Sequence, residues 1–457
     1  MDSKNFTTPF KPLYIATFVA AFLLCGTVNA QLNNMFTDTL NKVLAKRVSQ
    51  YSLKGVSASV VFSDGSTWKK TEGNAGTQVL DPSMLFEMGS NTKTFTAALI
   101  LLLEEEGKLS IEDTIYKYLS PLKNVTYGIT IRQLLNHTSG LYNYTNHPDF
   151  YDKINNSEPG VKWDIDTVLA TYVGTKLADP GVTHEYCNTG FILLGKIIEK
   201  VEGKPYHVVL REKILDKHNL KHIFLQGYDT FTEQRAETWL SNGVYFDETF
   251  VSFLTAAWAA GGIVATAEDL ALWAHKLYSG EVLSEASMTK MTTKLKIGNT
   301  TYPMGLSMFF TSFLGKQFWG HGGATLQNSE MEYSVSSKYS VVVVCNEQNT
   351  YTEALTIKRA IEEVLESSLP PLSVVEAEKP QFNVYPNPAN DVVNISIDNA
   401  AANNTVNIYT ITGQLVQQYK IESNNLQLHK DNIGTGVFIV EVAADNATAT
   451  RQRIVLY

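Results

Sequence analysis

The stretch Phe86-Glu-Met-Gly-Ser-Asn-Thr-Lys-Thr-Phe-Thr-Ala-Ala-Leu-Ile-Leu-Leu-Leu103 decides the fold and carries the first candidate for chemistry. Ser90 and Lys93 stand three residues apart at its start, and the Ala and Leu residues that follow favour a helix. Residues three apart share a helix face, so we expect the lysine amine beside the serine hydroxyl. A serine becomes a good nucleophile when a neighbouring base takes its proton, and burial lowers the pKa of a lysine enough to supply one.

The Ser-x-x-Lys spacing by itself is a weak signal. Three other copies begin at Ser66, Ser120 and Ser287, and most such pairs are a surface serine near a solvated lysine. The copy at Ser90 differs because it opens a strongly apolar helix. Its significance depends on partners elsewhere in the chain.

Composition limits the class of protein. The chain has 457 residues, of which 44% are hydrophobic and 18% charged, so it can form a large core and more than one domain. The formal net charge of -9 argues against binding nucleic acid through general electrostatics.

The first 30 residues have the pattern of a signal peptide. An apolar run over residues 13–25 follows a basic start, and the small residues at 28–30 suit a cleavage site. The run is short for a membrane span, so we expect a secreted or cell-surface protein without a transmembrane segment after signal removal. Cys187 and Cys345 then remain, and we expect both to be free thiols because two cysteines make no disulfide framework.

The order of predicted elements indicates an α/β (α+β) domain over residues 31–366. Strands at both ends of this range and helices between them would form one antiparallel sheet flanked by helices, with a helical region beside it. The expected strands are 56–62, 66–72, 318–321, 330–336 and 340–345, and the main expected helices are 34–53, 90–106, 191–201, 267–278 and 352–366. A Pro- and Ser-containing linker at 367–380 then leads to a small β-sandwich at 381–457.

A second candidate motif is Tyr186-Cys-Asn188. A lone tyrosine is usually a core or rim residue. Beside Lys93, however, the cation would favour the phenolate, and Tyr186 could then accept the serine proton and return it to a leaving group. We expect Asn188 to hold the lysine and a substrate amide.

The third motif is His321-Gly-Gly323-Ala324, which contains the only His-x-Gly of the chain and follows a predicted strand. Gly322 and Gly323 would let the strand edge approach a bound acyl group closely. The alternative interpretation is a simple turn with a surface histidine.

In this order the three motifs resemble those of the serine β-lactamase-like family, which includes class C β-lactamases, D-alanyl-D-alanine carboxypeptidases and related esterases. The resemblance runs from about residue 40 to 366 and is supported by the stretches 134–141, 186–190 and 261–266. It implies a β-lactamase/transpeptidase-like fold and no metal or organic cofactor.

The resemblance also implies roles for individual residues. Ser90 would be the acylated nucleophile, and Lys93 with Tyr186 would form the proton-transfer group. The backbone N–H groups of Ser90 and Ala324 would form the oxyanion hole. Asn188, His321, Gly322 and Gly323 would bind the substrate.

The chain departs from the β-lactamases of this family because it has no Lys-Thr-Gly at the third motif. Near its ordinary pKa of about 6.5, His321 would hold a substrate carboxylate only when protonated. The expected substrate is a D-amino-acid peptide, an ester or a β-lactam, with specificity set by loops 142–165 and 225–258. The alternative function is a catalytically silent, penicillin-binding-like protein.

The tail resembles a type IX secretion C-terminal sorting domain. The resemblance rests on the stretches 384–391, 409–416 and 434–438 and on the basic end at 451–456. It implies export through the periplasm and the type IX secretion machinery as a partner. The alternative interpretation is a binding module, for instance for carbohydrate.

Overall fold

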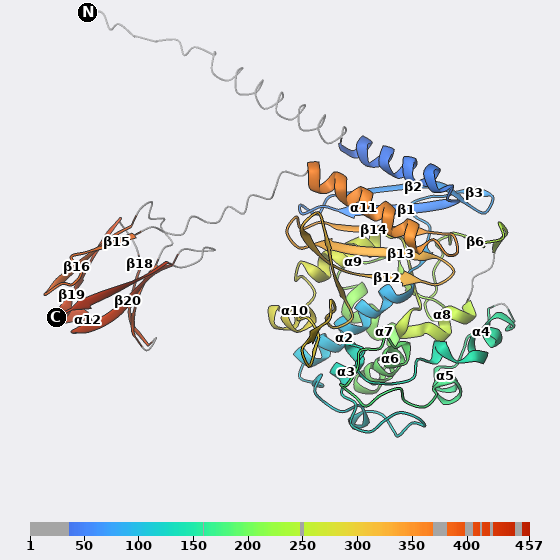
Figure 1. Ribbon diagram of the computed structural model, residues 1–457, viewed down its shortest axis with the longest axis horizontal. Coiled ribbons are helices and arrows are strands. Elements are labelled where there is room, and N and C mark those ends of the chain that lie inside the picture. The colour runs from blue at the N-terminus through green and yellow to red at the C-terminus, as the bar shows by residue number, and fades with distance from the viewer. Residues whose placement is uncertain are drawn as a thin grey trace, which may run out of the picture. The chain divides into compact units, whose positions relative to one another are not determined.

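The computed structural model describes residues 36–158, 160–246, 251–368, 382–397, 405–411, 414–420, 424–443 and 450–457 (Figure 1). The chain forms two compact units, residues 1–369 and 370–457. The predicted signal peptide and nearly all of the predicted linker lie outside the described residues.

The first unit is built on a seven-stranded antiparallel sheet that joins strands from both ends of the domain. Its order is β11-β12-β13-β14-β1-β2-β3. Val56 on the first strand pairs with Cys345 on β14, which confirms the predicted closure of the sheet. The bounds are β1 Gly55–Val61, β2 Thr67–Ala75, β3 Gln78–Val79, β11 Phe309–Phe313, β12 Lys316–Ala324, β13 Asn328–Ser334 and β14 Ser340–Cys345.

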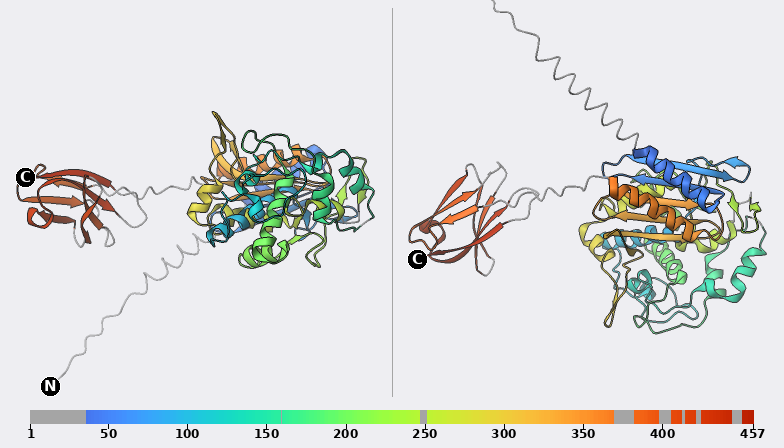
Figure 2. Two further views of the ribbon diagram at one scale, coloured as in Figure 1. Left: turned by 90° about the horizontal axis from the view of Figure 1, so that it is seen from below. Right: turned by 45° about the horizontal axis from the view of Figure 1, so that its top comes forward.

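Helices cover both faces of this sheet (Figure 2). Strand side chains alternate between the two faces, so each face has its own core. Val341 and Val343 pack with the helix at 36–51 and with α11 (Tyr351–Ser368), whereas Val342 and Val344 belong to the larger core that includes α9 (Ala267–Tyr278).

The long middle of the chain forms the helical region next to the sheet (Figure 1). No described helix is long and apolar enough to cross a membrane. The remaining helices and turns of this unit are η1 Gly89–Asn91, α2 Thr92–Glu105, η2 Ile115–Lys117, α3 Ile131–Leu135, η3 Tyr144–Asn146, α4 Pro148–Asn155, α5 Ile165–Tyr172, α6 Asn188–Glu202, α7 Tyr206–Leu210, η4 Arg211–Leu215, α8 Val251–Ala257, η5 Trp258–Ala260 and α10 Glu285–Met291. Its short strands are β4 Phe86–Glu87, β5 Ile223–Leu225, β6 Thr238–Trp239, β7 Tyr245–Phe246, β8 Ile263–Ala265, β9 Lys296–Ile297 and β10 Thr300–Thr301.

Several helix ends lie where local chemistry predicts them. The Thr266 hydroxyl accepts a hydrogen bond from the Asp269 N–H and caps α9, as expected. Gly203 ends α6 with a φ of 66°, a left-handed conformation that favours glycine. These signals depend on neighbours in the sequence, which is why sequence analysis finds them.

The second unit is a β-sandwich, as predicted. Its sheets have the orders β15-β16-β19 and β18-β17-β20-β21, and their inward side chains, including Val393 and Val440, form one core. The bounds are β15 Phe382–Tyr385, β16 Val392–Ile397, β17 Thr405–Thr410, β18 Leu415–Lys420, β19 Asn425–His429, α12 Lys430–Ile433, β20 Gly436–Ala443 and β21 Thr450–Leu456.

Candidate active site

Ser90 stands in the middle of the 3-10 turn η1, directly before α2. Gly89 opens this turn with a φ of 50°, and a Cβ there would lie only 3.0 Å from the Ala324 nitrogen. The glycine therefore permits both the turn and the close approach of the serine to the end of β12. The start of a helix also presents free backbone N–H groups to an oxyanion.

Lys93 lies beside Ser90, as the spacing predicts. Its Nζ donates to Ser90 Oγ at 2.9 Å and to the Ala260 carbonyl oxygen at 2.6 Å. The side chain is fully buried, and this burial lowers the pKa of Lys93 to about 7. Much of Lys93 is thus neutral near neutral pH, with a lone pair that can accept the serine proton.

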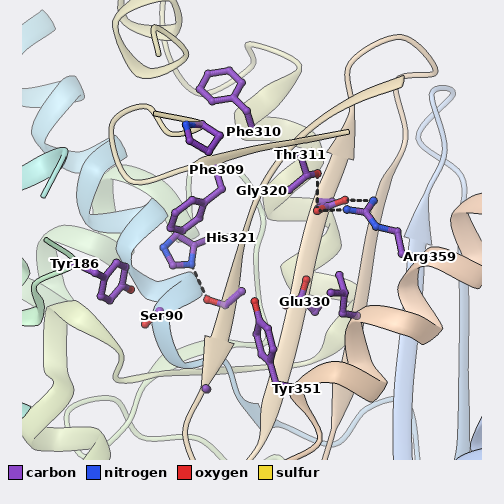
Figure 3. Close-up of a pocket in the computed structure, with 15 residues that line it drawn as sticks. Ser90, Tyr186, Phe309, Phe310, Thr311, Gly320, His321, Glu330, Tyr351 and Arg359 are labelled. Carbon is purple, nitrogen blue, oxygen red and sulfur yellow. Dashed lines mark hydrogen bonds and ion pairs between the residues drawn. The ribbon is translucent and has the colours of Figure 1, made fainter. Parts of the chain in front are cut away.

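Tyr186 completes this group, with its hydroxyl pointing toward Ser90 (Figure 3). Its ring lies 4.9 Å from Lys93 Nζ. The expectation that Tyr186 ionises readily is wrong, because burial raises the pKa of Tyr186 and Ser90 only partly offsets this. A lysine that is partly uncharged near neutral pH also stabilises a phenolate less than a permanent cation would. Tyr186 is therefore a neutral phenol that can donate a proton.

His137 is a neighbour of the site that the motifs did not reveal. It is buried with a left-handed φ of 59°, and its ring centroid lies 4.3 Å from that of Tyr186. Its Nδ1 accepts the Cys187 N–H at 3.1 Å, which fixes the backbone next to the tyrosine. His137 lies within the stretch 134–141 that resembles the family, and this resemblance could have identified it as a residue of the site.

The third motif forms the end of strand β12 and is not a turn, and His321 is buried there and does not lie on the surface. Gly323 has no room for a side chain, because a Cβ there would lie 2.1 Å from the Met88 carbonyl oxygen. The absence of a side chain at Gly323 thus lets β12 approach the backbone before Ser90. The sequence had instead suggested that this glycine makes room for a bound acyl group. Ala324, which is exposed, brings its N–H beside the turn that carries Ser90.

His321 does not have the charge expected of it. Burial first, and then the nearby Lys93, lower the pKa of His321 to about 3, so the ring is neutral across the physiological range. Its Nδ1 lies 2.6 Å from the Gly322 carbonyl oxygen and must donate to it, because a carbonyl only accepts. The Nε2 atom is then an acceptor, so His321 cannot serve as a fixed cation for a substrate carboxylate.

Asn188 does not hold the lysine. It begins α6, its side chain donates to Thr145 Oγ1 at 3.2 Å, and its N–H donates to Asn143 Oδ1. The Ala260 carbonyl takes the place that we expected for Asn188 beside Lys93. In the sequence, Ala260 directly precedes the stretch 261–266 that resembles the family, and this position could have indicated that its carbonyl lies near the site.

A cavity of about 540 Å³ opens beside Ser90, and β11, β12, β13 and α11 supply most of its walls (Figure 3). None of its lining residues comes from the loops 142–165 and 225–258 that we expected to set specificity. Sequence analysis missed the acidic and aromatic part of the lining, because no motif marks it. The lining residues are Ser90, Tyr186, Pro303, Phe309, Phe310, Thr311, Gly320, His321, Gly322, Ala324, Glu330, Glu332, Tyr351, Leu355 and Arg359.

The beta-lactamase family profile matches residues 40–366, which is most of the chain. The chain belongs to the beta-lactamase family. It is therefore placed among the serine hydrolases of that family. A second profile, for a secretion system C-terminal sorting domain, matches residues 383–456, and a domain of this kind indicates export.

Two relatives show how far the similarity extends. The chain is 26% identical over 304 residues to "Penicillin-binding protein 4*" of Bacillus subtilis (strain 168), a match that covers 63% of this chain and 66% of that protein. It is 29% identical over 253 residues to "Teichoic acid D-alanine hydrolase" of Staphylococcus aureus (strain NCTC 8325 / PS 47), covering 52% of this chain and 59% of that protein. The chain thus spans less than two thirds of the length of these relatives.

Solved structures of the beta-lactamase fold are similar as well. A D-stereospecific amidohydrolase from Streptomyces sp. matches with a TM-score of 0.61 and 26% identity, covering 70% of this chain and 98% of that one. The D-amino acid amidase from Ochrobactrum anthropi SV3 matches with a TM-score of 0.64 and 24% identity, covering 74% and 99%. At this low sequence identity, the match to the D-amino acid amidase is evidence for a shared fold only.

Proposed function

We propose that this beta-lactamase family member hydrolyses small amides or esters through an acyl-Ser90 intermediate. One observation carries the proposal: the Lys93 amine, with its pKa of about 7, lies 2.9 Å from Ser90 Oγ at the wall of an open cavity. Such a pair gives the serine a base near neutral pH.

Each proton in the proposed reaction has a donor and an acceptor. Lys93 takes the Ser90 proton while Oγ attacks the substrate carbonyl carbon, and the backbone N–H groups of Ser90 and Ala324 hold the oxyanion. Tyr186 gives its phenolic proton to the leaving amine or alcohol and regains one from the Lys93 ammonium. Water then attacks the acyl carbon while Lys93 takes one of its protons. The bond from the acyl carbon to Ser90 Oγ breaks, the Lys93 ammonium gives that proton to Oγ, and the carboxylic acid product leaves.

The contacts of the cavity lining favour substrates without a carboxylate near the site. His321 is neutral, and the donors of Arg359 bind Glu332 at 2.8 Å and Glu362 at 2.6 Å. No described side chain in the lining therefore offers a free cation to a β-lactam carboxylate. The names of two relatives, the D-stereospecific amidohydrolase and the teichoic acid D-alanine hydrolase, support an amide or ester of a D-amino acid as the substrate.

A labelling experiment separates this proposal from a silent binding protein. We expect a fluorophosphonate to label the purified wild type at Ser90, as read by intact-protein and peptide mass spectrometry. A panel of D-amino-acid amides, simple esters and a chromogenic β-lactam then ranks the substrates. Absence of both label and turnover in the folded protein would favour the silent alternative.

We expect the preference between anionic and neutral substrates to stay constant with pH. With a pKa of about 3, His321 stays neutral and gains no charge between about pH 5 and 8. Titration of Lys93 changes both rates together, so the ratio of kcat/KM for one anionic and one neutral ester should remain flat. A ratio that falls as the pH rises through about 6.5 would restore the charged histidine.

We also propose that residues 381–457 direct export through the type IX secretion machinery and take no part in hydrolysis. The match of residues 383–456 to a secretion system sorting domain supports this role. A protein ending at residue 368 should keep wild-type kcat/KM but remain in the periplasm of its host. Cell-surface protease sensitivity and fractionation measure the outcome, with the full chain as control. Surface exposure of the truncated protein would contradict the proposed role.

A further inference from the structure

Five ionisable side chains meet between β13 and α11, next to the cavity. Lys358 Nζ lies 2.6 Å from Glu330 Oε2 and 2.9 Å from Glu332 Oε1, and Arg359 binds Glu332 and Glu362. All are buried except Arg359, whose side chain is 19% exposed. The cluster has three carboxyl groups and two cations, so it can balance one further positive charge.

Glu330 Oε1 is the oxygen of this cluster that faces the cavity, where a further positive charge could bind. Glu330 is only 4% exposed and lines the cavity, and its Oε1 has no hydrogen-bond partner among the described residues. The Tyr351 hydroxyl lies near this carboxylate: burial first, and then Glu330 as a negative charge and as a hydrogen-bond acceptor, raise the pKa of Tyr351. The hydroxyl nevertheless does not meet hydrogen-bond geometry with Oε1, so Tyr351 is a neighbour that leaves this oxygen open to a stronger donor. A buried carboxylate oxygen without a donor is costly unless a ligand supplies one.

Gly322 leaves this oxygen accessible from β12. A Cβ at Gly322 would lie 2.7 Å from Glu330 Oε1 and 3.0 Å from Tyr351 Oη, so any side chain would cover the acid. Glu330 and Tyr351 approach the strand on one side while Ser90 lies across it (Figure 3). The cavity joins these groups, since Ser90, Gly322 and Glu330 all line it.

The charge balance of the cluster depends on the protonation of Glu362. Burial, and then the charge of Glu332, raise the pKa of Glu362 to about 8, so Glu362 is mostly protonated at neutral pH. Glu330 and Glu332 then balance Lys358 and Arg359. A cation that enters the cavity is attracted to the uncovered Glu330 oxygen, whereas an anion there is repelled by it.

We propose that Glu330 binds a primary ammonium group in the acyl part of the substrate, which makes the enzyme selective for free amino-acyl amides and esters. The proposal rests on the proposed acyl-serine function and specifies its substrate. Gly322 stands two residues before Ala324, the oxyanion donor, which is about 6–7 Å along a strand. An ammonium a few bonds from the scissile carbonyl, such as an α-amino group, fits this separation.

The test compares two ligands of nearly equal shape, D-alaninamide and isobutyramide, in which a methyl group replaces the ammonium. Each competes with a neutral fluorophosphonate for Ser90 in the wild type, in Glu330→Gln and in Glu362→Gln. The last variant is the matched control, because Glu362 belongs to the same cluster, does not line the cavity and is already protonated. The measured quantity is the ligand concentration that halves the labelling rate.

We expect D-alaninamide to protect the wild type at a concentration at least about tenfold lower than isobutyramide, which is a difference of roughly 1.4 kcal/mol. Glu330→Gln should abolish this difference, and Glu362→Gln should retain it. Should Glu330→Gln fail to fold, Gly322→Ala fills the site while keeping every charge and should abolish the difference too.

The outcomes separate the two proposals. Equal protection by both ligands in the wild type, or a preference that survives in Glu330→Gln, would refute the ammonium site while normal labelling upholds the serine hydrolase. Absence of labelling in the folded wild type would refute the serine hydrolase instead. Calorimetry with D-alaninamide and isobutyramide would then decide the ammonium site by itself, through the same tenfold preference.

Discussion

Replacing Ser90 with alanine is expected to lower kcat/KM by about 10⁴-fold or more and to abolish fluorophosphonate labelling. The physical reason is that Oγ is the atom that would form the acyl bond, and no other hydroxyl lies 2.9 Å from the Lys93 amine among the described residues. Steady-state kinetics with a neutral ester and mass spectrometry of the labelled protein measure both effects.

Ser120→Ala is the matched control for this experiment, because Ser120 has the same spacing to Lys123 but is exposed. It should behave as wild type. Circular dichroism and the thermal midpoint of Ser90→Ala should match the wild type as well. If folded Ser90→Ala retained more than a tenth of the wild-type rate, another nucleophile would have to be sought.

Lys93 is expected to set the pH dependence of the enzyme. The competent form is the neutral amine, so kcat/KM should rise about tenfold per pH unit below the pKa of about 7 and level off above it. Tyr186 stays a phenol over this range because burial raises its pKa. The rising limb should therefore show a single ionisation, measured with a neutral ester between about pH 5 and 9.

Lys93→Met should lower kcat/KM by about 10²–10⁴-fold and remove the rising limb, because the general base is lost. Lys123→Met, at an exposed position with the same spacing to a serine, is the control and should leave the profile unchanged. A wild-type profile that is flat, or that falls as the pH rises through 7, would exclude neutral Lys93 as the base.

Features that depend on near neighbours in the chain could be predicted from sequence. The placement of Lys93 beside Ser90 follows from helical spacing, and the ends of α9 and α6 follow from Thr266 and Gly203. The placement of Lys93 and the helix ends could be predicted because backbone geometry acts over a few residues. The antiparallel sheet joins distant segments, and it could be predicted because strands stand at both ends of a helical middle.

Protonation states could not be predicted in this way. The three motifs suggested an ionised Tyr186 and a protonated His321, whereas both side chains are neutral in the structure. Burial decides this, because removing water disfavours the charged form of any group. Burial is produced by segments far apart in sequence, such as the Ala260 carbonyl that holds Lys93, 167 residues away.

The proposed preference of the cavity for an ammonium group was equally hidden in the sequence. Glu330 and Lys358 stand 28 residues apart with nothing between them that marks a motif, and only the packing of α11 on β13 brings them together. The same packing leaves Glu330 Oε1 beside the gap at Gly322. The sequence by itself determined the placement of Lys93 beside Ser90 and the antiparallel sheet of the first unit. The tertiary structure decided which groups carry charge in the cavity, because the cost of burying a charge depends on all the groups packed around it.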